Sequence, residues 1–130
     1  MKPKVLIVDD DVAIRQQLFW SLCDDYEVMT ASDLPSAIRR ATIYEPDVSI
    51  LDLHLPPTLN SPDSGLRILE YLKGHFPLSK AFVVTSETDE EMEKACLEGG
   101  ADGFLNKPLD VEHLLSTVRR LTLTRQLEAA

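Results

Sequence analysis

Apolar residues along the chain gather in five short runs that longer, mixed segments separate. The runs cover residues 5–8, 27–31, 48–52, 81–85 and 103–106. A strand inside a parallel sheet is covered on both faces, so it shows as a continuous apolar run rather than as an alternation. The runs at 5–8, 48–52 and 81–85 therefore predict buried strands, and the less apolar runs at 27–31 and 103–106 predict two further short strands.

Apolar residues in the segments after these runs recur at helical spacing, which predicts five helices. The helices are expected at residues 12–24, 34–43, 65–76, 89–98 and 111–121. Ser32 or Asp33 can cap the second helix, and Gly99 with Gly100 can form the C-terminal cap of the fourth. The stretch 56–64 is rich in Pro, Ser, Thr and Asn, which predicts a loop.

Strands and helices that alternate five times predict one α/β domain, a doubly wound parallel sheet with helices on both faces. A length of 130 residues fits a single domain. We assign residues 1–122 to it. Residues 123–130 continue the helical pattern through Leu123 and Leu127, so they extend the last helix or begin a linker to an output domain outside these residues.

The acidic composition limits the partners that this chain is expected to bind directly. Its formal net charge is −9, whereas nucleic acids and anionic membranes attract basic surfaces. No apolar run approaches the ~20 residues of a membrane span, and the first residues enter a strand without a signal peptide. Cys23 and Cys96 lie far apart, outside any CxxC motif. We therefore expect a cytoplasmic chain with two buried thiols and with no nucleic-acid or membrane contact.

Polar side chains stand at the C-terminal ends of four of the five strands. They are Asp9 with Asp10, Asp52, Thr85 with Ser86, and Lys107. In an open α/β sheet these ends lie along one edge, where such folds bind ligands. Clustered carboxylates repel one another unless a cation lies between them, and an all-oxygen site suits a hard divalent ion. The pattern predicts a Mg²⁺ site, with Mn²⁺ as the alternative ion.

The same residues suit the transfer of a phosphoryl group. With a divalent ion to neutralise the incoming group, the Asp52 carboxylate can attack phosphorus and form an acyl phosphate. Lys107 supplies a cation for the phosphoryl oxygens, and the Thr85 hydroxyl supplies a hydrogen bond. Taken singly, each residue also has a plainer interpretation: a helix cap for an aspartate, a strand-end hydroxyl for Thr85 and a surface charge for Lys107. Their combination at one sheet edge favours the chemical site.

Four motifs, in their order and spacing, resemble the receiver domain of two-component response regulators from about Lys4 to Leu121. They are Val8-Asp9-Asp10, Asp52 with Pro56 four residues later, Thr85-Ser86, and Lys107-Pro108 with Phe104 three residues before the lysine. The resemblance implies a flavodoxin-like fold with strand order 2-1-3-4-5. It also implies that the phosphoryl group comes from a histidine kinase, a phosphotransfer protein or a small donor.

The resemblance further implies a role for each site residue. The implied Mg²⁺ ligands are Asp9, Asp10, Asp52 and the backbone carbonyl of His54. Asp52 is the implied phosphoacceptor, and Thr85 and Lys107 contact the phosphoryl group. Asp11 falls one place beyond the acidic pair of the family, so we expect it to cap the following helix.

In such receivers phosphorylation switches the packing of one face of the molecule. The resemblance implies that Thr85 moves towards the phosphoryl group and Phe104 turns inward, which repacks the face made by the fourth helix, fifth strand and fifth helix. In this family the side chains at the positions of His54 and Glu87 border the path of the attacking water, so the resemblance implies that these two residues set the phosphoryl lifetime. The alternatives are that Phe104 is a plain core residue and that His54 and Glu87 are solvated surface residues.

Two backbone features complete the comparison with the family. The resemblance implies a cis peptide bond between Lys107 and Pro108, and it places a loop glycine about four residues after Pro56. In this chain that glycine is Gly65, so the loop is about five residues longer. The extra length either alters access to Asp52 and adds partner contacts or is a tolerated surface insertion.

The long loop and the helical tail resemble receivers of enhancer-binding transcription activators, which indicates an output in transcription. A homodimer through the switching face or the last helix is a further expectation. The leading hypothesis is a switch whose only reactions are self-phosphorylation and self-dephosphorylation at Asp52. One alternative is a phosphatase-like enzyme, although His54 stands where such enzymes carry a second acid. The other is a degenerate receiver that acts only as a protein-binding module, which the complete set of site residues disfavours.

Overall fold

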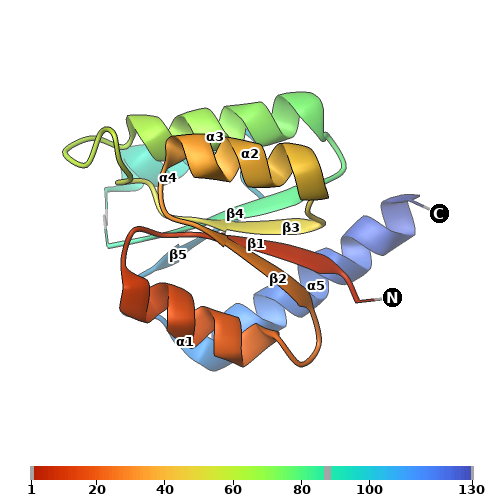
Figure 1. The fold of residues 1–130 in the computed structure, drawn as a ribbon. Helices are drawn as coiled ribbons and strands as arrows, with labels where there is room; N and C mark the ends of the chain where they lie inside the picture. Colours follow the sequence, from red (N-terminus) through yellow and green to blue (C-terminus); the bar gives the residue numbers. More distant parts are fainter. Residues whose placement is uncertain (1, 87–88, 130) are drawn as a thin grey trace.

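A computed structural model of the chain describes residues 2–86 and 89–129. Five strands and five helices alternate within them (Figure 1). The strands are β1 (Lys4–Val8), β2 (Glu27–Ala31), β3 (Val48–Leu51), β4 (Lys80–Thr85) and β5 (Gly103–Asn106). The helices are α1 (Val12–Leu22), α2 (Leu34–Tyr44), α3 (Asp63–His75), α4 (Glu90–Glu98) and α5 (Val111–Ala129).

The strands form one parallel sheet in the order β2-β1-β3-β4-β5. The register places Val8 beside both Ala31 and Leu51, and Leu51 beside Val83. The carboxyl ends of β1 and β3 are therefore level, and the residues that follow them emerge side by side. The predicted doubly wound sheet and its strand order are confirmed.

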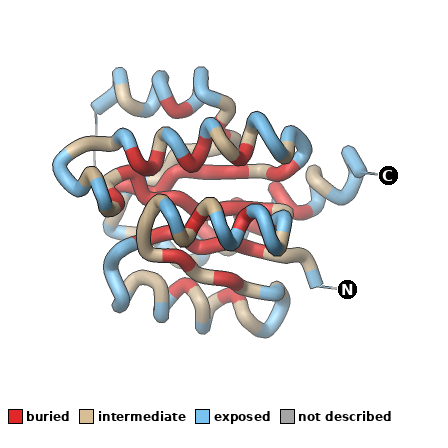
Figure 2. Tube along the Cα trace, turned by 45° about the horizontal axis from the view of Figure 1, so that its top comes forward, coloured by how far each residue is buried: buried red, intermediate tan, exposed pale blue. Residues whose placement is uncertain are grey.

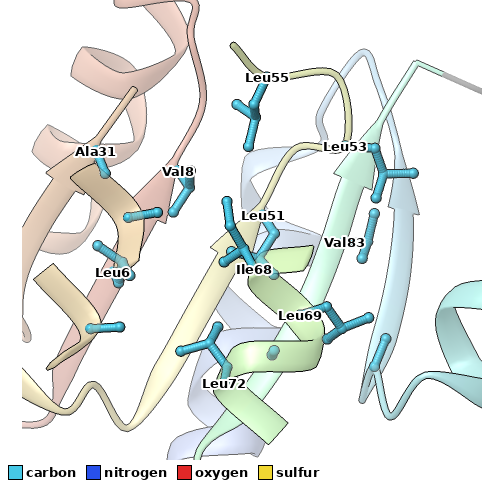
Figure 3. Close-up of a cluster of buried hydrophobic side chains, with 14 of the residues drawn as sticks. Leu6, Val8, Ala31, Leu51, Leu53, Leu55, Ile68, Leu69, Leu72 and Val83 are labelled. Atoms are coloured by element: carbon cyan, nitrogen blue, oxygen red, sulfur yellow. The ribbon is translucent and has the colours of Figure 1, made fainter. Parts of the chain in front are cut away.

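Helices cover both faces of the sheet, with α2, α3 and α4 on one face and α1 and α5 on the other (Figure 1). Successive strand residues point to opposite faces, so each strand feeds two separate cores. One core packs strand residues such as Leu51 and Val83 against Ile68, Leu69 and Leu72 of α3 (Figure 3). Burial is concentrated along the strands and the inner sides of the helices (Figure 2).

Aspartate caps begin α1 and α2. The Asp11 carboxylate accepts hydrogen bonds from the backbone amides of Ala13 and Ile14 at 2.9 and 3.3 Å, which confirms the predicted cap of α1. Asp33, rather than Ser32, caps α2. Each cap satisfies amides that have no partner inside the helix.

Replacing Asp33 with alanine is expected to lower the free energy of unfolding by about 1 kcal/mol, because the amide of Ser36 loses its acceptor at 2.8 Å. The hydrogen bonds from Ser36 lower the pKa of Asp33. The folded state therefore favours the carboxylate, whose contribution is full above the unfolded pKa and declines as pH falls through the lowered folded pKa.

Urea denaturation of wild type, Asp33→Ala and Asp33→Asn at neutral and acidic pH measures this contribution. Asparagine retains the acceptor and should recover most of the stability. If the difference in unfolding free energy between wild type and Asp33→Ala stayed constant from about pH 7 to pH 3, the ionised Asp33 carboxylate would not be the group that stabilises α2.

The start of α3 differs from the sequence-based expectation. The predicted loop runs to residue 64, whereas α3 begins at Asp63. Ser61 Oγ accepts from the amide of Asp63 at 3.1 Å, and Thr58 Oγ1 accepts from the amide of Ser64 at 3.1 Å. The polar residues that suggested a loop are the ones that begin the helix, so the predicted boundary is wrong by two residues.

The two cysteines are less alike than expected. Cys96 is buried, whereas Cys23 is only partly buried, and within the described ranges neither forms a disulfide. The apolar residues of α1 also spread around the helix, since Leu18 and Leu22 are buried but Trp20 is 72% exposed. None of the helices in the described part of the chain is long and apolar enough to cross a membrane.

The last helix runs without a break through the proposed boundary at residue 122. Its final turns are tied to the amino-terminal edge of the sheet, where Lys80 Nζ lies 2.8 Å from Glu128 Oε2 and Arg125 Nε lies 3.9 Å from Asp47 Oδ1. The tail thus contacts the base of the sheet through these two ion pairs, while Leu123 and Leu127 are exposed. Its role as the start of a linker stays a prediction.

Candidate functional site

Three of the predicted acidic residues meet at the carboxyl edge of the sheet. One carboxylate oxygen from each of Asp9, Asp10 and Asp52 lies within 4.8 Å of the others. Asp9 follows β1 and Asp52 follows β3, the two neighbouring strands whose ends are level. Asp9 and Asp52 are buried, whereas Asp10 is exposed.

Lys107 joins this cluster from the end of β5. Its Nζ donates to Asp9 Oδ2 at 2.8 Å and to Asp52 Oδ2 at 3.1 Å, and its side chain is only 17% exposed. The backbone amide of Lys107 donates to the Thr85 carbonyl at 2.9 Å, which fixes the start of the side chain beside β4. One ammonium group therefore bridges the two buried carboxylates.

Burial and charge act in opposite directions on these groups. Burial raises the pKa of Asp52 because the ionised carboxylate loses water, the Lys107 charge lowers this pKa, and the Asp9 charge raises it again. The net result is a raised pKa. Burial lowers the pKa of Lys107, but its hydrogen bond to Asp9 and the charges of both aspartates outweigh burial, so the pKa of Lys107 is raised. The lysine is held as a cation inside the cluster.

The backbone after Asp52 is fixed by a close approach of α3. The amide of Gly65 donates to the Leu53 carbonyl at 3.1 Å. A Cβ atom at Gly65 would lie 2.5 Å from Leu53 Cα and 2.6 Å from the Asp52 carbonyl oxygen, so no side chain fits there. Leu53 and Leu55 are fully buried, which leaves Asp52 and His54 as the side chains directed away from the core.

The extended loop is folded against this segment. Thr58 closes it, because its Oγ1 lies 2.6 Å from Ser64 Oγ and its amide donates to the Leu55 carbonyl at 2.9 Å. His54 Nδ1 lies 3.2 Å from the Leu59 carbonyl oxygen, and a carbonyl only accepts, so Nδ1 donates in this contact. The loop therefore contacts the His54 ring directly. The role of the His54 backbone carbonyl as a metal ligand stays a prediction.

The remaining predicted residues lie on β4, on β5 and just after them. Thr85 is fully buried at the end of β4, and Phe104 on β5 is partly buried against the core that contains Val83. The peptide bond between Lys107 and Pro108 is cis. Glu87, predicted to border the path of the attacking water, lies outside the described residues. The roles of these residues in phosphoryl transfer and switching stay predictions.

Sequence reasoning missed one residue that touches the site. Arg15 on α1 points back towards the end of β1, and its Nη1 donates to the Asp9 carbonyl at 2.7 Å. An arginine in the first turns of a helix usually extends into solvent, and no motif spacing marked this one. Only the path of the chain from β1 into α1 reveals the contact.

The oxygen-rich cluster fits a hard divalent cation. Three carboxylates converge within 4.8 Å, and carboxylate oxygens are the ligands that Mg²⁺ prefers. Asp10 is exposed, which leaves room for the waters that Mg²⁺ usually retains.

Comparison with known proteins places the chain in a family. The family model of the response regulator receiver domain matches residues 5–119. The transcriptional regulatory protein KdpE of Mycobacterium tuberculosis is 35% identical over 129 residues, which cover 95% of this chain and 54% of that protein. The oxygen regulatory protein NreC of Staphylococcus carnosus is 34% identical over 119 residues, which cover 89% of this chain and 53% of that protein. This chain thus spans about half the length of these relatives.

Solved structures show the same relationship. The CheY-like response regulator receiver domain protein of Methanospirillum hungatei superposes with a TM-score of 0.89 at 26% identity, over 98% of this chain and 99% of that one. The family match runs from Val5 in β1 to Arg119 in α5 and includes the acidic edge described above. The chain therefore belongs to the response regulator receiver domain family.

Proposed function

We propose that this receiver domain is a phosphorylation-controlled switch in which Asp52 accepts a phosphoryl group from a histidine kinase or a phosphotransfer protein. The observation that carries the proposal is the Lys107 ammonium, which contacts both Asp9 and Asp52 beside a third carboxylate. Lys107 brings one positive charge to the three carboxylates, and a bound divalent cation would offset the remaining negative charge, so that the site could receive a phosphoryl group.

Asp9, Asp10, Asp52 and the His54 carbonyl are the residues that we assign to Mg²⁺, and Mn²⁺ is the alternative ion. When bound, the ion supplies positive charge that offsets the charge of the phosphoryl oxygens. An Asp52 carboxylate oxygen attacks phosphorus, the bond between phosphorus and the donor atom breaks, and the donor leaves with that electron pair. Lys107 favours the ionised, nucleophilic form of Asp52 against the effect of burial.

The switch that we propose uses the α4, β5 and α5 face. In α4, Cys96 is the one fully buried side chain and Met92 is half-buried, while its other residues are exposed, so this helix is weakly held. Weakly packed elements are the ones that rearrange at low cost. Thr85 at the site and the partly buried Phe104 behind it are the residues expected to link phosphorylation to that face.

The output belongs to the same proposal. The relatives are named as regulatory proteins, KdpE as a transcriptional one, so we propose control of transcription through a further domain or partner. The proposal also includes a homodimer through the switching face or the end of α5. It further includes a cytoplasmic location. The only reactions that we propose for the chain are its own phosphorylation and dephosphorylation at Asp52.

Intact mass after incubation with acetyl phosphate tests the proposal. Wild type should gain one phosphoryl group in the presence of Mg²⁺ and none after Mg²⁺ is chelated. Asp52→Asn should gain none, because the amide lacks the nucleophilic carboxylate. Hydroxylamine should remove the adduct, since it cleaves acyl phosphates. Asp63→Asn, which changes an exposed aspartate at the start of α3, is the matched control and should react like wild type.

Other outcomes would point elsewhere. An adduct that persists in Asp52→Asn would show that another residue is the acceptor. The absence of an adduct with acetyl phosphate and with every histidine kinase tried would favour a protein-binding module. Sustained release of phosphate from small phosphate esters would favour a phosphatase.

A further inference from the structure

Arg15 lies beside the acidic cluster and has no part in the proposed chemistry. Its guanidinium Nη1 donates to the Asp9 carbonyl at 2.7 Å, and its own backbone amide donates to the Asp11 carbonyl at 3.0 Å. The second bond belongs to the backbone of α1 and would form with any residue at position 15, so the Arg15 side chain itself holds the turn of residues 9–11 at the Asp9 carbonyl. Hydrogen bonds from a charged donor are stronger than those between neutral groups.

The turn between β1 and α1 holds its three aspartates differently. Asp9 is fixed at its amide by the Ala31 carbonyl, at Oδ1 by the amide of Asp11 and at Oδ2 by Lys107. Asp11 is fixed as the cap of α1. The Asp10 carboxylate has no hydrogen bond to any other residue in the described ranges. The backbone on either side therefore sets the position of the Asp10 side chain. On the preceding side, Arg15 holds that backbone at the Asp9 carbonyl.

A cation site depends strongly on that placement. Mg²⁺ demands near-ideal octahedral geometry, so a carboxylate that wanders costs affinity. Outer groups that orient metal ligands typically change metal affinity by roughly 10- to 100-fold when they are removed. Loss of the Arg15 side chain would release the Asp9 carbonyl and loosen the attachment of Asp10.

Charge acts in the opposite direction. A guanidinium close to the cluster repels a divalent cation, so its removal should tighten metal binding if Arg15 acts only as a charge. If Arg15 acts by geometry, its removal should weaken binding. The two roles therefore predict changes of opposite sign.

We propose that Arg15 is a positioning residue for the divalent-cation site, holding the turn that places Asp10 beside Asp9 and Asp52. The proposal rests on the proposed function, because it takes that acidic cluster to be the Mg²⁺ site. It adds a residue from α1 that touches neither the ion nor the phosphoryl group.

Isothermal titration with Mg²⁺ alone tests the proposal on wild type, Arg15→Met, Arg15→Lys and the control Arg119→Met. Arg119 is exposed on α5. The Kd of Arg15→Met should rise about tenfold over wild type. Arg15→Lys keeps the charge but lacks the planar fork of donors, so any loss in that variant reports geometry, and about threefold is expected. Circular dichroism at the titration temperature confirms that each variant is folded.

The outcomes separate the two proposals. The positioning role would be overturned, and the Mg²⁺ site left in place, by either of two results. In the first, Arg15→Met and Arg15→Lys bind Mg²⁺ as tightly as wild type. In the second, Arg15→Met binds Mg²⁺ more tightly than wild type. If Arg15→Met does not fold, an unchanged Kd in Arg15→Lys overturns the role by itself. Wild type that binds no Mg²⁺ would overturn the metal site of the proposed function and the role of Arg15 with it.

Discussion

Gly65→Ala is expected to lower the free energy of unfolding by about 3 kcal/mol, at the upper end for an overpacked site. The added Cβ would lie 2.5 Å from Leu53 Cα and 2.6 Å from the Asp52 carbonyl oxygen. Both neighbours are backbone atoms, which no side-chain rotation can move aside. Either α3 must move away from the sheet or the segment after β3 must shift.

The same shift should reach the acidic cluster. The amide of Gly65 donates to the Leu53 carbonyl, and the amide of Leu53 donates to Asp52 Oδ1 at 2.7 Å, so displacing this backbone displaces the Asp52 carboxylate. We therefore expect Gly65→Ala to react more slowly with acetyl phosphate than wild type under conditions where the variant is folded.

Gly74→Ala is the matched control, because it makes the same change in the same helix. Apart from its chain neighbours and the backbone of its own helix, no atom of the described residues lies within 4 Å of the Cβ position at Gly74. Alanine is the better helix former, so this variant should gain about 0.5–1 kcal/mol. Urea denaturation of both variants measures the contrast. If Gly65→Ala gained stability as Gly74→Ala does, the close approach of α3 to Leu53 would not exist in solution.

The fold was accessible from sequence because apolar runs and helical spacing are local signals. Buried runs such as 48–52 are too apolar for surface strands, and short connections leave few topologies. The gathering of Asp9, Asp52 and Lys107 followed from the rule that parallel strands end at one edge. In the structure Lys107 contacts both aspartates, although 98 and 55 residues separate them in sequence.

The features that could not be predicted from the sequence depend on contacts between helices, strands and loops. Gly65 could be recognised as a loop glycine, but its packing against Leu53 depends on how closely α3 approaches the sheet. Arg15 carries no signal, since its contact is with a backbone carbonyl that any residue would present. The polar residues of the long loop resemble an insertion, yet Thr58 uses its hydroxyl to close that loop on Ser64. Hydrogen bonds of this kind have no periodicity.

Lys107→Met should also destabilise the protein strongly when Mg²⁺ is absent. The lysine bridges Asp9 and Asp52, whose side chains are only 5% and 9% exposed. Removing one partner of a buried ion pair leaves an uncompensated charge and costs about 3–5 kcal/mol. Because Lys107 is itself 17% exposed, we expect a loss of about 3 kcal/mol near pH 8.

Lys94→Met is the matched control, because it removes the same charge from a side chain that is 77% exposed and 4.0 Å from Glu98. Its effect should stay within about 0.5 kcal/mol. Saturating Mg²⁺ should restore much of the loss in Lys107→Met, since a divalent ion that binds only the folded state stabilises it and neutralises the same carboxylates.

The loss in Lys107→Met should depend on pH with a definite sign. The pKa of Asp52 is already raised by burial, and the lysine charge that opposes this effect would be gone. The folded variant would then bind a proton more tightly than the unfolded chain, so its stability falls as pH rises from the unfolded pKa through the raised folded pKa. The deficit relative to wild type should be small near pH 4 and complete near pH 8. Urea denaturation across that range measures it, and a deficit independent of both pH and Mg²⁺ would mean that Lys107 stabilises the fold by packing alone.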